Sequence, residues 1–201
     1  MRFQALTLSL LASAGLATPV RRDVSHAVYT LRLTSSVKSL DGLYLTATPS
    51  PGSNSNTTTL GVYTSPSSPS TPTIKFYPVH NPSTNLNELR TTGPTDSSTL
   101  AVVGANGLLD FASVADPAAV ELPEGTTCDW TSFLLLDDKG KGAAVKYAGG
   151  GADEGRWVAF PVDGVSKEGN GGWSVKWKDA SAWTTTDYMP VQVVYELVKD
   201  E

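Results

Sequence analysis

Two short apolar runs, at 157–162 and 173–177, constrain the fold of this chain most strongly. They carry three of the five tryptophans, and the glycine-rich segment between them has the backbone freedom that a chain reversal needs. In the second run apolar residues alternate with Ser174 and Lys176, so both tryptophans and Val175 share one face of a predicted strand. We expect all three tryptophans in the core, because this alternation is typical of a half-buried strand. An aromatic platform for sugar rings is the alternative.

The rest of the chain repeats this pattern of short strands separated by turns. About twelve segments have strand character and none has a 3.6-residue period, so we predict an all-β protein. The clearest hairpin turns at Asn106-Gly107, between apolar runs at 100–103 and 108–112. The polar stretch 81–96 is predicted to be a turn-rich connection.

The predicted strands sort into three sets of four. A glycine leads into the second strand of each set: Gly42, Gly107 and Gly155. An apolar run marks the fourth strand of each set: 74–77, 133–136 and 191–195. This threefold pattern predicts a single β-trefoil-like barrel. A two-sheet β-sandwich is the alternative, because short strands with frequent turn signals suit both architectures.

The chain begins with processing signals. Arg2 and the apolar run at 5–16 are typical of a secretory signal peptide, and a small-x-small cleavage site ends at Ala17. The apolar run is shorter than the ~20 residues of a membrane-spanning helix, so we expect a secreted, extracellular protein. Arg21-Arg22 is a dibasic cleavage site. We therefore predict a signal peptide, a short propeptide and one all-β domain: 1–17, 18–22 and 23–201.

A Ser/Thr/Pro-rich loop region is predicted at 48–73. Every residue from 64 to 73 is Ser, Thr or Pro, a composition that cannot supply a packed element. Asn56-Thr57-Thr58 is the chain's one N-glycosylation sequon, so we expect a glycan on Asn56. A short strand at 60–63 is predicted to interrupt the region, and 64–73 is predicted to be a solvated loop that could carry O-linked sugar, with an interaction motif as the alternative.

Charge and cysteine content narrow the classes of partner. Loss of Arg2, Arg21 and Arg22 from the 15 basic residues leaves 12 against 20 acidic ones, a net charge of −8. Nucleic acid and anionic membrane both require a basic protein surface, so neither is a predicted partner. We also expect a monomer. Cys128 is the only cysteine, which excludes an intramolecular disulfide. We expect a buried, inert thiol, with a reactive or intermolecular one as the alternative.

No motif with a catalytic mechanism is present. The chain has two histidines and no Gly-x-Ser-x-Gly, so a Ser-His-Asp arrangement has no sequence support. One cysteine and two separated histidines exclude a zinc site of the usual ligand types, and we predict no metal and no cofactor. Several carboxylates could in principle form the pair that glycoside hydrolysis needs: Asp110, Asp129, Asp137, Asp138, Asp179 and Asp187.

Several strings resemble small secreted β-rich proteins of filamentous ascomycete fungi. Beside the Arg21-Arg22 site they are DGLYL at 41–45, GLLDF at 107–111, WVAFP at 157–161 and WSVKWKD at 173–179. The likeness covers most of the predicted mature chain. It implies an extracellular β-rich architecture and assigns no functional residue.

The loop at 179–189 holds the candidate binding residues. Trp183 alone among the tryptophans lies outside any strand pattern, and Asp187 and Tyr188 follow it closely. An exposed indole could stack on a sugar ring while its neighbours bond hydroxyls. Alternatively, Trp183 folds back and plugs one end of the barrel. We predict a secreted non-catalytic domain that binds a glycan or a cell-wall or host protein. A glycoside hydrolase with loop carboxylates and a structural or immunogenic surface protein are the alternatives.

Overall fold

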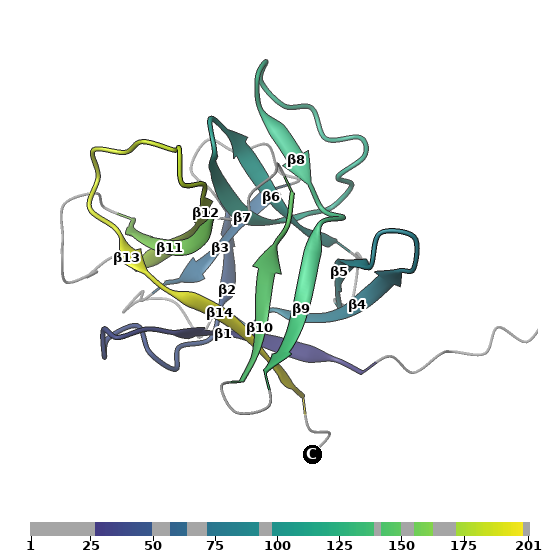
Figure 1. The fold of residues 1–201 in the computed structure, drawn as a ribbon, viewed down its shortest axis with the longest axis horizontal. Coiled ribbons are helices and arrows are strands. Elements are labelled where there is room, and N and C mark those ends of the chain that lie inside the picture. The colour runs from purple at the N-terminus through teal and green to yellow at the C-terminus, as the bar shows by residue number, and fades with distance from the viewer. Residues whose placement is uncertain are drawn as a thin grey trace, which may run out of the picture.

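The structure, a computed structural model, describes residues 27–49, 57–63, 72–92, 98–138, 142–149, 155–162 and 172–198. These ranges contain fourteen β-strands and no helix, so the all-β prediction is confirmed, and none of them could cross a membrane as a helix (Figure 1). The strands are β1 (Tyr29–Thr34), β2 (Thr46–Pro49), β3 (Thr57–Val62), β4 (Lys75–Asn81), β5 (Leu86–Thr91), β6 (Thr99–Ala105), β7 (Leu108–Val114), β8 (Thr127–Asp129), β9 (Phe133–Asp138), β10 (Gly142–Tyr147), β11 (Arg156–Pro161), β12 (Trp173–Lys178), β13 (Met189–Pro190) and β14 (Gln192–Leu197).

Some predictions lie outside the described residues. These are the signal peptide and propeptide, with Ala17, Arg21 and Arg22, the sequon residue Asn56, and most of the Ser/Thr/Pro-rich region.

Six strands form a closed barrel. β1 pairs with β4 and β14, and β4 pairs with β5. On the other side β14 pairs with β10 and β10 with β9. The ring closes where Asn87 of β5 pairs with Phe133 of β9, and the Asn87 amide donates to the Phe133 carbonyl at 3.2 Å. A continuous ring of pairings identifies a barrel rather than two stacked sheets.

Three hairpins complete the fold. They are β2–β3, β6–β7 and β11–β12, and their inner strands β3, β7 and β12 also pair with one another. A six-strand barrel with a triangle of three hairpins is the β-trefoil arrangement that the threefold sequence pattern predicts (Figure 1).

The triangle repeats its register around a pseudo-threefold axis. Three pairs are equivalent: Thr59–Ala112, Asp110–Lys176 and Ser174–Gly61. The next residue in each strand points inward and is fully buried: Leu60, Phe111 and Val175. Strand pairing is close here, since a Cβ on Gly61 would lie 2.1 Å from the Trp173 carbonyl oxygen. The axis therefore has a core side of large apolar residues and an outer side of small or polar ones.

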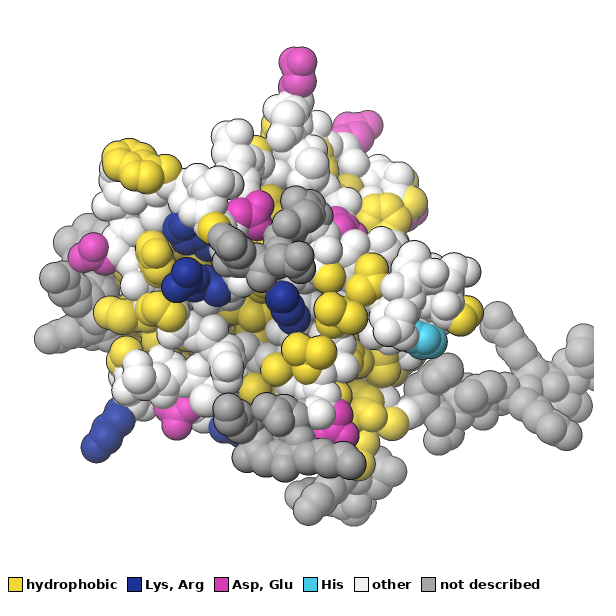
Figure 2. Space-filling model, viewed as in Figure 1, with side chains coloured by type: hydrophobic (Ala, Val, Ile, Leu, Met, Phe, Trp, Pro, Cys, Tyr) yellow, Lys and Arg dark blue, Asp and Glu magenta, His cyan; other side chains and the backbone are white. Residues whose placement is uncertain are grey.

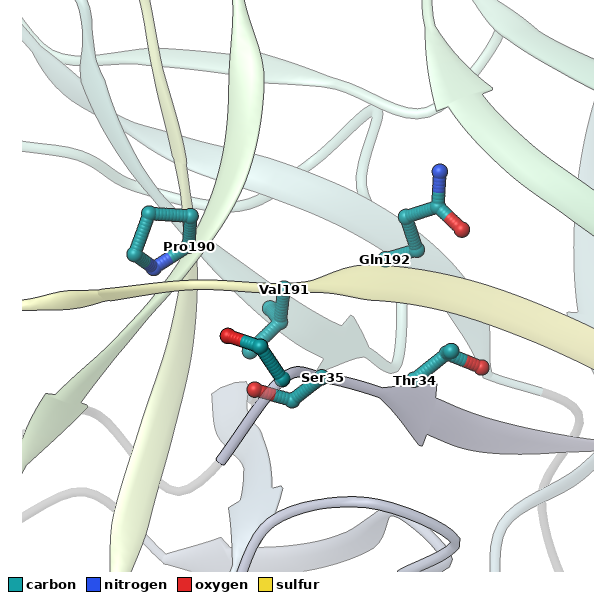
Figure 3. A pocket seen from close by; sticks show the side chains of 6 residues that line it. Thr34, Ser35, Pro190, Val191 and Gln192 are labelled. Carbon is teal, nitrogen blue, oxygen red and sulfur yellow. The ribbon is translucent and has the colours of Figure 1, made fainter. Parts of the chain in front are cut away.

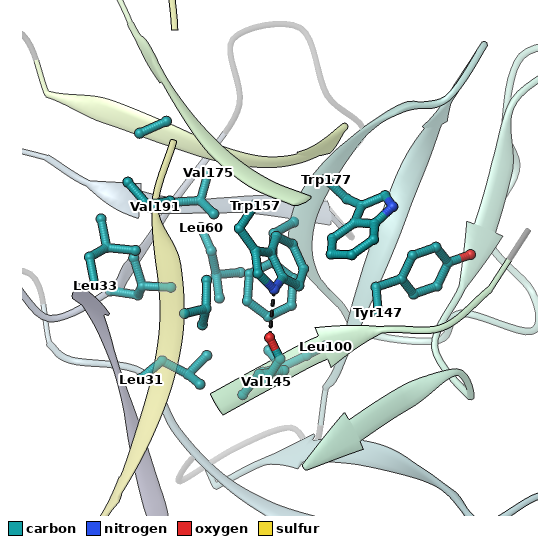
Figure 4. Close-up of a cluster of buried hydrophobic side chains, with 14 of the residues drawn as sticks. Leu31, Leu33, Leu60, Leu100, Val145, Tyr147, Trp157, Val175, Trp177 and Val191 are labelled. Atoms are coloured by element: carbon teal, nitrogen blue, oxygen red, sulfur yellow. Dashed lines mark hydrogen bonds between the residues drawn. The ribbon is translucent and has the colours of Figure 1, made fainter. Parts of the chain in front are cut away.

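The three predicted core tryptophans are confirmed as core. Trp157, Trp173 and Trp177 are 4 %, 4 % and 1 % exposed. Trp157 and Trp177 face each other across β11 and β12 in an edge-to-face contact with ring centroids 5.2 Å apart. The Trp157 indole N–H donates to the Val145 carbonyl at 2.7 Å, which joins the hairpin to the barrel (Figure 4). The Trp177 indole N–H likewise has a partner, the Asp179 carboxylate at 2.8 Å, so both facing indoles are hydrogen-bonded at the edge of an apolar cluster.

Two local predictions are wrong. The predicted connection at 81–96 contains β5, where Leu89 and Thr91 face the core, and the buried Thr91 hydroxyl donates to the Ser98 carbonyl at 2.9 Å. The other error concerns Gly107, which lies in the turn between the second and third strands of its set and not at the start of a second strand. Asn106 and Gly107 have φ of 54° and 74°, the left-handed pair that a tight hairpin turn requires.

Candidate functional site

The loop between β12 and β13, residues 179–188, presents Trp183 to solvent. Its side chain is 85 % exposed, so the alternative in which Trp183 plugs the barrel is wrong. The neighbouring Ala182 is buried instead, at 7 % exposed. A small residue anchors the loop, and the large one next to it projects outward.

The base of this loop is fixed to the β6–β7 turn. The Asp179 amide donates to the Gly107 carbonyl at 2.8 Å, and the Ala182 amide donates to the Asp179 carbonyl at 3.1 Å. The Asp179 carboxylate accepts the indole N–H of Trp177 at 2.8 Å. A Cβ on Gly107 would lie 2.9 Å from this carboxylate and 3.3 Å from the Ala182 methyl. These contacts hold Trp183 on an ordered support.

Tyr188, at the other end of the loop, covers the outer face of β11. Its ring is half-buried, with its centroid 5.6 Å from that of Phe160. The Lys178 ammonium lies 5.9 Å from the centroid of the Tyr188 ring, within cation–π range. The Asp187 side chain is exposed. Of the three predicted ligand residues, Trp183 and Asp187 thus face solvent, while Tyr188 also serves packing.

Lys178 contacts residues at both ends of the loop, Asp179 and Tyr188. Its ammonium donates to the Asp179 carbonyl at 3.1 Å, the oxygen that also accepts the Ala182 amide. The ammonium therefore lies at the base of the turn that presents Trp183 and also beside Tyr188. Figure 2 shows Lys and Arg side chains gathered over the β11–β12 region, with hydrophobic side chains around them.

The candidate catalytic carboxylates have structural partners in several cases. Asp110 forms an ion pair with Lys176 at 2.6 Å. Asp129 accepts the Tyr147 hydroxyl at 2.9 Å and the Thr131 amide at 2.9 Å. Burial raises the pKa of Tyr147, and the negative charge of Asp129 raises it further. Asp179 is held by Trp177 as described above, and Asp137 lies exposed on β9. Asp110, Asp129 and Asp179 therefore each hold a neighbouring side chain of the fold: Lys176, Tyr147 and Trp177.

A shallow hollow of about 270 Å³ lies where the end of β1 meets the start of β14 (Figure 3). Its lining is neutral, with hydroxyl, amide and apolar groups: Thr34, Ser35, Ser36, Pro190, Val191 and Gln192. No local sequence signal marks this hollow, because its two sides come from opposite ends of the chain. Only the register of β1 against β14 brings them together.

Cys128 is half-buried beside a small apolar cluster on the outer side of β6 and β7. Burial, and then the charge of Asp129, raises the pKa of its thiol to about 11. The thiol is therefore protonated at neutral pH, as expected of an inert cysteine. In the part of the chain that the structure describes, no three His, Cys, Asp or Glu residues are grouped to hold a metal ion.

Comparison with family models, with curated proteins and with solved structures finds no match to this chain. The candidate site therefore rests on its geometry alone.

Proposed function

We propose that this protein is a secreted, non-catalytic binding module that holds a glycan against Trp183. The observation that carries the proposal is the contrast between this side chain and the other tryptophans. Trp157, Trp173 and Trp177 are buried and Trp130 is half-buried, whereas Trp183 is 85 % exposed. An exposed indole forfeits a large hydrophobic stabilisation, which is a cost that a binding role explains.

The support beneath Trp183 favours a ligand that docks on a preformed surface. Asp179 is bonded to the β6–β7 turn and to Trp177, and Ala182 is bonded to Asp179, so the indole needs little ordering when it binds. A flat indole face matches the apolar face of a sugar ring. The carboxylate of Asp187 and the Tyr188 hydroxyl, on the same loop, supply polar groups for sugar hydroxyls.

Binding is tested with a glycan array and with sedimentation of insoluble cell-wall polysaccharides. Trp183→Ala should abolish retention and leave the melting temperature within a degree or two of the parent, as for a surface change. Leu197→Ala is the matched control, because Leu197 is also exposed, at 57 %, but lies on β14. Retention of glycan by Trp183→Ala would refute the proposal.

The same polysaccharides separate binding from hydrolysis. Release of soluble sugar by the parent, lost when one of the loop carboxylates Asp179 or Asp187 is changed to Asn, would favour the glycoside hydrolase instead. Mass spectrometry of secreted protein tests the extracellular part of the proposal. It should find a chain that starts at Asp23 and carries a glycan on Asn56, whereas an intact Met1 would count against secretion by the predicted route.

A further inference from the structure

We infer that the saccharide bound at Trp183 is acidic, and that Arg156 and Lys178 hold its carboxylate or sulfate. This inference rests on the proposed function and names the class of ligand that the site takes. Its evidence comes from the register of β11 against β12 and from the contacts of Lys178.

Arg156 and Lys178 form a directly opposed pair of cations across the β11–β12 hairpin. The next pair, Trp157 with Trp177, points into the core, so the two cations belong to the outer face. Like charges directly opposite each other destabilise a sheet. A bound anion would convert this unfavourable pair into a favourable cluster.

No ion pair between described residues neutralises this pair. Lys176, one step along the same face, has its own ion pair with Asp110 at 2.6 Å. Among the described residues neither Arg156 nor Lys178 takes part in an ion pair. The Asp179 carboxylate accepts from the Trp177 indole, and Lys178 bonds the Asp179 carbonyl instead. Two cations thus remain available on one side of the loop.

Lys178 lies at the base of the turn that presents Trp183, and Arg156 lies opposite Lys178 on the hairpin. The Lys178 ammonium and the Ala182 amide each lie 3.1 Å from the Asp179 carbonyl oxygen, and Trp183 is the next residue. A sugar ring stacked on the indole would therefore bring a substituent within reach of Lys178. A carboxylate or sulfate there can accept charge-assisted hydrogen bonds, and Arg offers a second, forked donor.

Local contacts must provide this selectivity, because the chain as a whole has a net charge of −5. Long-range attraction of an extended polyanion is opposed by that charge. The expected ligand is therefore a saccharide with an acidic ring at the stacked position, recognised through two short contacts.

The test measures affinity for three short oligosaccharides of equal length: an oligogalacturonide, its methyl ester and a sulfated neutral sugar. The parent should bind at least one anionic sugar about tenfold more tightly than the ester, the effect expected of one charge-assisted hydrogen bond. Which anion is preferred tells whether the source is a uronic acid or a sulfated glycan. The double variant Arg156→Gln, Lys178→Gln should lose the preference and keep its affinity for the ester.

Lys75→Gln is the matched control, because Lys75 is an exposed cation on β4. It should keep the preference and melt like the parent. The double variant loses the Lys178 bond to the Asp179 carbonyl, so its unchanged affinity for the ester is the check that the loop is still in place. Affinity for both anionic sugars no higher than for the ester, or a preference that survives the double variant, would overturn the inference while the proposed function stands. Failure of the parent to bind any saccharide would overturn both.

Discussion

Replacement of Trp177 by alanine should destabilise the protein strongly, because this side chain joins the core to the candidate site. Trp177 is 1 % exposed, and its ring has edge-to-face contacts with Trp157 and Tyr147, at centroid distances of 5.2 and 5.6 Å. Emptying a site of this size costs about 3–5 kcal/mol. For a domain of this length that corresponds to a fall in melting temperature of about 6–20 °C.

A second variant separates the volume of Trp177 from its hydrogen bond. Trp177→Phe keeps an aromatic ring but removes the indole N–H that the Asp179 carboxylate accepts at 2.8 Å. It should cost about 1.5–3 kcal/mol, the range for a hydrogen bond to a charged group. It should also weaken glycan binding, because the base of the loop loses a contact.

Urea unfolding followed by circular dichroism measures both variants, and the slope with denaturant shows whether the unfolding stays two-state. An alanine variant that melts within a degree of the parent would show that Trp177 is not buried. The core assignment of the whole β11–β12 hairpin would then be wrong.

Three further predictions concern Gly155 and Tyr147, which contact Trp177, and Cys128, which packs against the small cluster outside β6 and β7. Gly155→Ala should destabilise by about 1–3 kcal/mol in a urea titration, because its Cβ would lie 2.3 Å from the buried Trp177 ring, and unchanged stability would contradict that packing. Burial raises the folded-state pKa of Tyr147 above its unfolded value near 10, so its contribution to stability is complete below about pH 10 and is lost as pH rises further. Tyr147→Phe should therefore flatten the alkaline fall of the free energy of unfolding, and an equal fall in both proteins would refute this. Finally, iodoacetamide should alkylate native Cys128 at pH 8 about 100-fold more slowly than the unfolded chain, since its pKa is raised to about 11, and equal rates would show a reactive thiol.

The strand pattern was readable where polar and apolar residues alternate without interruption. Trp173, Val175 and Trp177 showed the buried face of β12, and the three apolar runs assigned to fourth strands coincide with β4, β9 and β14. These signals are local, because a strand with one buried face must alternate whatever it pairs with. The threefold grouping followed from them and predicted the trefoil.

The strand that closes the barrel, β5, could not be predicted from the sequence. The inner face of β5 carries Asn87, Leu89 and Thr91, of which only Leu89 is apolar, so the strand lacks the usual alternation of apolar and polar residues. Thr91 is tolerated there because its hydroxyl bonds the Ser98 carbonyl, a partner that only the folded chain supplies. A strand whose buried face contains polar residues with tertiary partners therefore cannot be predicted from the alternation of apolar and polar residues.

The candidate site was only partly predictable for a similar reason. Position in a loop suggested Trp183, but whether it plugs the barrel or projects depends on Ala182 and Asp179 packing against Gly107. The pairing of Arg156 with Lys178 depends on the hairpin register, which the intervening glycine-rich segment leaves open in the sequence.

Tryptophan fluorescence with acrylamide as quencher tests the central claim most directly, that Trp183 is an exposed, preformed surface for a saccharide. One of the five tryptophans should be readily quenched in the free protein, and Trp183→Phe should remove that component while the buried indoles stay protected. A bound saccharide should shield the quenchable component in the parent. The account is contradicted if the quenchable component persists in Trp183→Phe, or if a saccharide that binds the protein leaves the accessibility of Trp183 unchanged.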